Sequence, residues 1–83
     1  MFNPFTVTGC SLELLRTEER GIIAFCKSQD ATILKKLTAM GLIPGVTISI
    51  KQRFPSLLIK VGSTIFKLDR EATRAIYVRL LDN

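Results

Sequence analysis

The chain has 83 residues, 47% of them hydrophobic, and a formal net charge of +5. This length predicts a single domain with one compact core, whose folding buries only about 60–65% of the surface that the unfolded chain exposes. The apolar runs fall well short of the ~20 residues of a membrane-spanning helix, and the N-terminus lacks the basic and apolar regions of a secretory signal, so we expect a cytoplasmic protein.

The residue types that carry most catalytic and metal chemistry are scarce. The sequence has no histidine and only two cysteines, Cys10 and Cys26. The lack of histidine removes the commonest general base and the commonest transition-metal ligand. No glycine-rich phosphate-binding loop is present either. We therefore expect a protein that is not an enzyme and that holds no cofactor.

Basic residues are concentrated in the middle of the chain. From Arg20 to Lys67 there are eight lysines and arginines and a single acidic residue, Asp30. A basic surface of this kind suits an acidic protein, an anionic lipid face or a nucleic acid. It is equally typical of a surface that lysines keep hydrated.

The N-terminal part predicts little regular structure. Residues 1–10, interrupted by Pro4, are expected to form a lead-in to a single domain at 11–83. Residues 11–15 predict a short turn over one end of the core. The β-branched and aromatic residues of segment 21–27 predict the first core strand.

A helix and a sharp corner follow this strand. The Ser-Gln-Asp segment at 28–30 offers N-cap side chains, and apolar residues recur at helical spacing over 33–40. Gly41 stands where the end of a helix requires a positive φ. Pro44 then prevents further helix, and Gly45 completes a turn.

The second half of the sequence alternates in the manner of half-buried strands. Gly62-Ser63 is a two-residue hairpin signal, and Asp69 can cap a single helical turn at 70–74. The expected strands lie at 46–51, 57–61, 64–68 and 76–80. The fold class is therefore mainly β: a small barrel of five to six strands, with one covering α-helix and a short helical turn before the last strand.

The most distinctive stretch of the sequence is Leu-x-x-Met-Gly-Leu-x-Pro-Gly at 37–45. With this corner, the hairpin at 59–68 and the closing segment at 71–78, the chain resembles the FeoA family (ferrous iron transport protein A). The resemblance covers nearly all of residues 11–80. The same domain occurs at the C-terminus of some metal-dependent repressors of the diphtheria-toxin-repressor type.

The resemblance implies an SH3-like barrel and an accessory part in bacterial ferrous iron uptake. FeoA-like proteins are expected to act beside FeoB, a membrane transporter with a cytosolic GTP-binding domain. The implied partner is therefore the cytosolic part of an FeoB-type transporter. The implied activity is regulatory contact without chemistry of its own, with the protein peripheral to the membrane at most.

The outer face of the hairpin is the first candidate for partner binding. If the alternation holds, Leu58 and Ile65 point outward near Phe54. Lysines rim this patch, and Lys51, Arg53 and Lys60 are expected to share its face. Such a patch suits a protein partner. The alternative, held as equal, is that the hairpin twists or bulges so that Leu58 and Ile65 enter the core.

The corner is the second candidate. Leu37 and Met40 are expected in the core, whereas Leu42 and Ile43 are adjacent and cannot both point inward easily. The predicted partner-binding residues are thus Leu42, Ile43, Lys51, Arg53, Phe54, Leu58, Lys60 and Ile65. The residues expected to serve backbone geometry are Gly41, Pro44, Gly45 and Gly62.

Two other functions remain open at this stage. The alternative is a nucleic-acid-linked domain or the accessory domain of a metal-sensing regulator. No direct nucleic-acid partner is expected, because aromatic residues are sparse and a stacking platform would be weak. A metal-binding sensor is disfavoured by the missing ligands. Self-association of the chain is left open.

Overall fold

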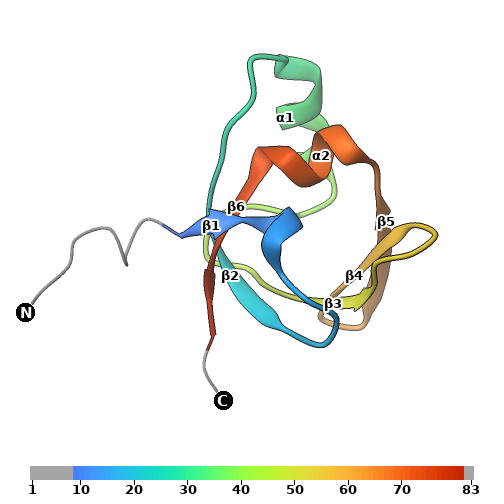
Figure 1. Ribbon diagram of the computed structural model, residues 1–83. Helices are drawn as coiled ribbons and strands as arrows, with labels where there is room; N and C mark the ends of the chain where they lie inside the picture. Colours follow the sequence, from blue (N-terminus) through green and yellow to red (C-terminus); the bar gives the residue numbers. More distant parts are fainter. Residues whose placement is uncertain (1–8, 82–83) are drawn as a thin grey trace, which may run out of the picture.

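The computed structural model describes residues 9–81, and most of the predicted lead-in, 1–8, lies outside this range. These described residues form six strands, two α-helices and one 3-10 turn (Figure 1). In order these are β1 (Cys10–Ser11), η2 (Leu12–Leu14), β2 (Arg20–Cys26), α1 (Ala31–Ala39), β3 (Thr47–Gln52), β4 (Leu57–Val61), β5 (Thr64–Leu68), α2 (Arg70–Ala75) and β6 (Ile76–Leu80).

The strands build one antiparallel sheet with the order β1-β6-β2-β3-β4-β5. The sheet curls around the core, and α1 and α2 lie beside each other over one end of it (Figure 1). The predicted strands at 57–61, 64–68 and 76–80 match β4, β5 and β6 from end to end. The sixth strand is β1, a two-residue segment that pairs with β6 at Cys10 and Ser11.

The core is made by the inward side chains of the strands and is closed by the two helices. Strand alternation places Ile48 and Ile50 of β3, Ile59 of β4 and Ile76 and Val78 of β6 inside the sheet, all fully buried. From the helices and η2, Leu12, Leu37, Ala72 and Ala75 complete the same cluster. Met40 packs against this cluster but stays half-buried.

Two irregularities in the pairing help the sheet to curl. The register shifts between Ile23 and Phe25 where β2 pairs with β6, and between Ile50 and Gln52 where β3 pairs with β4. A bulge adds one residue to one strand and increases its local twist. Each shift therefore lets a short strand bend and serve two differently oriented neighbours.

The corner after α1 is a complete Schellman motif, with Gly41 at φ 80°. The Gly41 N–H donates to the Thr38 carbonyl at 3.0 Å, and the Leu42 N–H donates to the Leu37 carbonyl at 2.9 Å. This motif brings the residue after the glycine against the last turn of the helix. The prediction that Leu42 lies at the surface is therefore wrong: its side chain is 1% exposed and packs in the core with Leu37.

The corner is also bonded directly to the sheet. The Gly45 N–H donates to the Ile23 carbonyl at 2.8 Å, and the Ile23 N–H donates to the Val46 carbonyl at 2.8 Å. Gly45 has a φ of 96°, a conformation that is strained for any residue with a side chain. The two bonds fix the direction in which β3 starts.

Asp69 caps α2 and ties it to α1. Its carboxylate accepts a hydrogen bond from the Ala72 N–H at 2.8 Å and an ion pair from Lys36 Nζ at 3.1 Å. The backbone hydrogen bond first, and Lys36 second, hold the pKa of Asp69 below its ordinary value. The charged form is therefore the one that the folded state favours.

We expect Leu42→Ala and Ile43→Ala to lower the free energy of unfolding by very different amounts, although the two residues are adjacent. Leu42→Ala removes a buried side chain and should lower the free energy of unfolding by about 2–5 kcal/mol. Ile43 is 45% exposed, so Ile43→Ala should cost under about 1 kcal/mol. Urea unfolding at constant m-value measures both, and equal losses would contradict the described corner.

We expect Asp69→Ala to lower the free energy of unfolding near neutral pH by about 1 kcal/mol, because the α2 cap is lost. The depressed pKa means that Asp69 stabilises the fold above its unfolded-state pKa and loses this effect as the pH falls through the folded-state value. The difference in the free energy of unfolding between the wild type and Asp69→Ala should therefore become smaller below about pH 4.

Asp69→Asn is the matched control, because it keeps an oxygen for the Ala72 N–H but carries no charge. Urea midpoints at neutral pH and at pH 3 should show a smaller loss for Asp69→Asn than for Asp69→Ala. A gap between wild type and Asp69→Ala that does not change with pH would contradict a stabilising carboxylate.

Candidate partner-binding surface

The outer side of the β4–β5 hairpin carries alternating apolar and basic side chains. The register pairs Leu58 with Lys67 and Lys60 with Ile65, while Ile59 and its partner Phe66 point inward. Ile65 is 50% exposed and Leu58 is half-buried. Of the two arrangements that the sequence left open, the structure thus has the one with Leu58 and Ile65 on the outer side. We call Leu58, Lys60, Ile65 and Lys67 the hairpin face.

Strand β3 continues this face on one side. Ser49 pairs with Lys60, and Gln52 pairs with Leu58, with the register shift between them. Lys51 lies in the shifted segment, and its Nζ is 3.7 Å from Glu18 Oε2. The predicted residue Lys51 therefore lies next to the hairpin face, but its charge is matched by an acid of the same chain.

The lysines of the hairpin face have no such acid. The ion pairs within residues 9–81 are Lys36–Asp69, Lys51–Glu18 and Arg74–Glu13. None of them involves Lys60 or Lys67, which are both exposed. Their charges are therefore free to attract an acidic surface.

Phe54 projects from the loop between β3 and β4. Its side chain is 85% exposed. The loop is held across its base, because Gln52 Nε2 donates to the Ser56 carbonyl at 3.2 Å. A large aromatic side chain so open to water is a strong candidate for burial by a partner.

Arg53 has a structural task that its sequence pattern did not indicate. Its guanidinium donates to the Leu15 carbonyl and, at 2.8 Å, to the Glu13 carbonyl. The side chain is half-buried. Arg53 thus joins the Phe54 loop to the end of η2, and the predicted partner residue lies partly beneath the surface.

A groove of about 420 Å³ lies where this loop, the end of β5 and the start of α2 meet. We call it the seam groove. Its charged lining residues are Glu13, Arg53, Lys67, Asp69 and Arg70. Both acids are paired outside the lining, Glu13 with Arg74 and Asp69 with Lys36. Among the described residues, the three cations have no ion pair, so the groove favours an anionic group.

A second groove, of about 290 Å³, lies between α1 and the corner. Phe25, Leu34, Ile43 and Pro44 line it, together with Cys26 and Leu42. The Cys26 thiol donates to the Leu42 carbonyl at 3.6 Å, and burial raises its pKa. The thiol therefore stays protonated and serves packing. Two predicted partner residues, Leu42 and Ile43, line this groove, but of the two only Ile43 is exposed.

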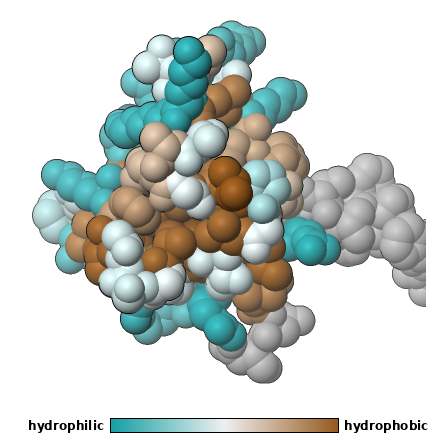
Figure 2. Space-filling model, turned by 180° about the vertical axis from the view of Figure 1, so that it is seen from behind, coloured by the Kyte–Doolittle hydropathy of each residue, from teal (hydrophilic) through white to brown (hydrophobic). Residues whose placement is uncertain are grey.

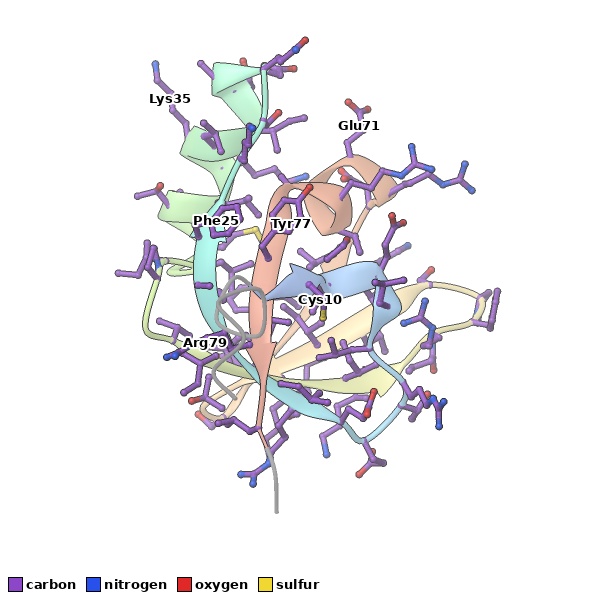
Figure 3. All side chains as sticks on the ribbon, turned by 60° about the vertical axis from the view of Figure 1, so that its left-hand side comes forward. Cys10, Phe25, Lys35, Glu71, Tyr77 and Arg79 are labelled. Atoms are coloured by element: carbon purple, nitrogen blue, oxygen red, sulfur yellow. The ribbon has the colours of Figure 1, made fainter. Side chains whose placement is uncertain are left out.

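An aromatic pair borders the second groove. The Phe25 and Tyr77 rings stack with centroids 4.7 Å apart and planes at 10°. Figure 3 shows them side by side on β2 and β6 below α1. The sequence did not predict this pair, because only the β2–β6 register joins two residues so far apart along the chain.

Apolar side chains are exposed at several places in residues 9–81. The large ones are Leu14, Phe25, Ile43, Phe54, Ile65 and Leu80. Figure 2, which views the molecule from behind, shows apolar surface gathered in the middle of that face with hydrophilic side chains around it. The hairpin face differs from the second groove in that lysines alternate with its apolar side chains.

Two further features are absent from residues 9–81. No group of three or more His, Cys, Asp and Glu side chains is placed there to hold a metal ion. No helix there has the length and apolar character needed to cross a membrane.

Comparison with known proteins identifies relatives of this chain. The sequence model of the FeoA domain matches residues 10–80. A curated protein of Leptolyngbya boryana, named "Putative Fe(2+) transport protein A", is 35% identical over 77 residues, which cover 92% of this chain and 94% of that protein.

Solved structures share the fold. A crystal structure of FeoA, described as an iron uptake regulatory protein, has a TM-score of 0.79 at 25% identity and covers 90% of this chain and 100% of its own. FeoA of Stenotrophomonas maltophilia has a TM-score of 0.75 at 21% identity, and the match covers 83% of this chain and 88% of its own. It is described as a prokaryotic SH3 domain protein and was solved with zinc.

The fold also occurs in a larger protein. T. acidophilum IdeR gives a TM-score of 0.83 at 22% identity, covering 96% of this chain but 37% of IdeR. At this identity the likeness concerns the fold alone. Together these structures confirm the predicted fold class, a small SH3-like barrel with one covering helix and a helical turn before the last strand.

We expect Arg53→Lys to destabilise the protein although it keeps the positive charge. Lysine cannot bridge the two carbonyls as the planar guanidinium does, so the free energy of unfolding should fall by about 1 kcal/mol. Urea unfolding measures the loss, and Lys60→Arg on the hairpin face is the control. An unchanged midpoint for Arg53→Lys would contradict the structural task of Arg53.

Proposed function

The chain belongs to the FeoA family, and from this membership we propose that it is an accessory protein of bacterial ferrous iron uptake. In this proposal it acts in the cytoplasm by docking on the cytosolic part of an FeoB-type transporter. Membership of the family supports the partner, and the name of the curated relative supports the role in Fe(2+) transport. The geometry described above supports the docking surface.

The alternation of apolar and free basic side chains on the hairpin face carries the proposal for the docking surface. Burial of a Leu, Ile or Phe side chain contributes about 1.5–3 kcal/mol each, so Leu58, Ile65 and Phe54 can supply most of the affinity. Lys60 and Lys67 would speed encounter with an acidic surface. The surface therefore needs a partner that offers apolar side chains among carboxylates.

Contact alone is enough for this function. A regulator that docks on a GTP-binding region acts by its different affinity for the states of that region. It requires a stable surface and no reaction of its own. The framework of the hairpin face meets this need, because β4 and β5 are hydrogen-bonded strands joined by a two-residue turn.

The regulator-domain alternative has weaker support. The relative that is 35% identical carries a name from Fe(2+) transport. The likeness to IdeR rests on 22% identity and concerns the fold. We therefore place this chain with the transport proteins.

We expect Ile65→Asp to weaken capture of the cytosolic GTP-binding region of the FeoB-type transporter from the same genome by at least about tenfold. The substitution puts a carboxylate into the apolar centre of the proposed contact. Leu58→Asp should act in the same direction. Isothermal titration calorimetry with the purified region measures the dissociation constants.

Leu80→Asp is the matched control, because Leu80 is 49% exposed and lies on β6, away from the hairpin. It should bind as the wild type does. Unfolding midpoints show whether each variant keeps its fold. Equal binding by Ile65→Asp and Leu80→Asp would exclude the hairpin face as the docking surface. An absence of binding by the wild type would exclude the transporter region as the partner.

A further inference from the structure

Strand β5 is the last strand of the sheet and has a free edge. Within residues 9–81, β5 is hydrogen-bonded to β4 alone. Figure 1 shows β5 at the side of the molecule, below α2. A strand at such a position presents unpaired backbone N–H and C=O groups on its outer edge.

The hairpin geometry identifies which backbone groups these are. Gly62 has a φ of 61°, and Ser63 is not among the described residues with positive φ, so the turn is of type II′. Val61 and Thr64 flank this two-residue turn as a hydrogen-bonded pair, and hydrogen-bonded and non-bonded pairs then alternate along the ladder. Ile65 and Lys67 fall in the non-bonded pairs, so their N–H and C=O groups point to the free edge.

The side chains along this edge combine two characters. Lysine on an edge strand is a usual guard against unwanted strand pairing. Ile65 does not fit that purpose, because an exposed β-branched residue favours pairing. Lys67 disfavours pairing with a basic or apolar strand and favours pairing with an acidic one. The edge of β5 therefore allows some strands to pair with it and discourages others.

The seam groove continues from the end of this edge. Lys67 and Leu68 of β5 line it together with Arg70 and Arg53. Its two acids are each paired with a cation outside the lining. A strand laid along β5 would therefore bring its own end, or a carboxylate near that end, into a groove that favours negative charge.

We propose that an extended segment of the protein partner, with alternating acidic and apolar side chains, adds as a strand to the free edge of β5. Its backbone pairs with Ile65 and Lys67, and its carboxylates meet Lys67 and the cations of the seam groove. This proposal rests on the proposed docking function and states how the partner is recognised. Strand addition is a general mode of peptide recognition in which backbone hydrogen bonds give affinity and alternate side chains give specificity.

The charge argues against a second copy of this chain as the occupant. Two β5 edges that paired would bring together two hairpin faces, each with the free lysines Lys60 and Lys67. Each chain also carries a net charge of +5. Like charges across paired strands are unfavourable.

The comparison of Lys67→Pro with Lys67→Thr tests the proposal. Both remove the charge, but only proline removes the N–H at the free edge, and proline is tolerated on an edge strand where that N–H faces solvent. The transporter region described above is the probe. Lys67→Pro should bind at least about tenfold more weakly than Lys67→Thr, whereas unfolding midpoints should show both variants folded.

Amide hydrogen exchange of the wild type gives a readout without mutation, should Lys67→Pro fail to fold. The Ile65 and Lys67 amides should exchange quickly in the free protein and at least about tenfold more slowly in the complex. The Phe66 amide is the internal control, because it is already paired with β4 and should change little.

The outcomes separate the two proposals. If the wild type does not bind the probe, the proposed docking function fails and strand addition fails with it. If the wild type binds but neither proline nor exchange distinguishes the edge, strand addition alone is overturned. Sedimentation of the chain by itself tests whether a second copy of the chain occupies the edge. A dimer that Lys67→Pro abolishes would assign the edge to a second copy and overturn the proposal of a partner strand.

Discussion

The hydrogen bonds that join the corner to β2 hold the architecture together. At this point the end of α1, the turn at Gly45 and the start of β3 are fixed to Ile23 by two backbone bonds of 2.8 Å. A short helix of this kind has little stability of its own, so its position depends on such tertiary contacts. Because Leu42 is drawn into the core by the same turn, the corner also seals the sheet beneath α1.

The direction of β3 determines which side chains the β4–β5 hairpin exposes. Once β3 is set, its pairing with β4 and the register shift after Ile50 determine which residues of the hairpin point outward. The core residue Ile59 and the surface residue Lys60 are neighbours in one strand, so a slip by one residue would exchange them. The buried face of the hairpin therefore enforces the chemistry of its exposed face.

The sequence predicted the elements whose signals are local. Strands β4 and β5 alternate on either side of Gly62-Ser63, and their predicted bounds were correct. Asp69 stands where a cap is needed, so the start of α2 was also correct, although the helix runs one residue further than predicted. Features that depend on distant contacts were missed: Arg53 reaches a carbonyl 38 positions away, and Phe25 meets Tyr77 only through the sheet register. Leu42 was misplaced because a pair of adjacent apolar residues does not say which one the Schellman turn buries.

The anchorage of Arg53 has a thermodynamic consequence for recognition. With its guanidinium bonded to η2 and Gln52 bonded to Ser56, the loop that bears Phe54 is ordered before any encounter. The conformational entropy of that backbone is therefore lost during folding and is not lost again when a complex forms. In this loop, association must still order the exposed Phe54 side chain, which a backbone fixed in advance presents to the partner.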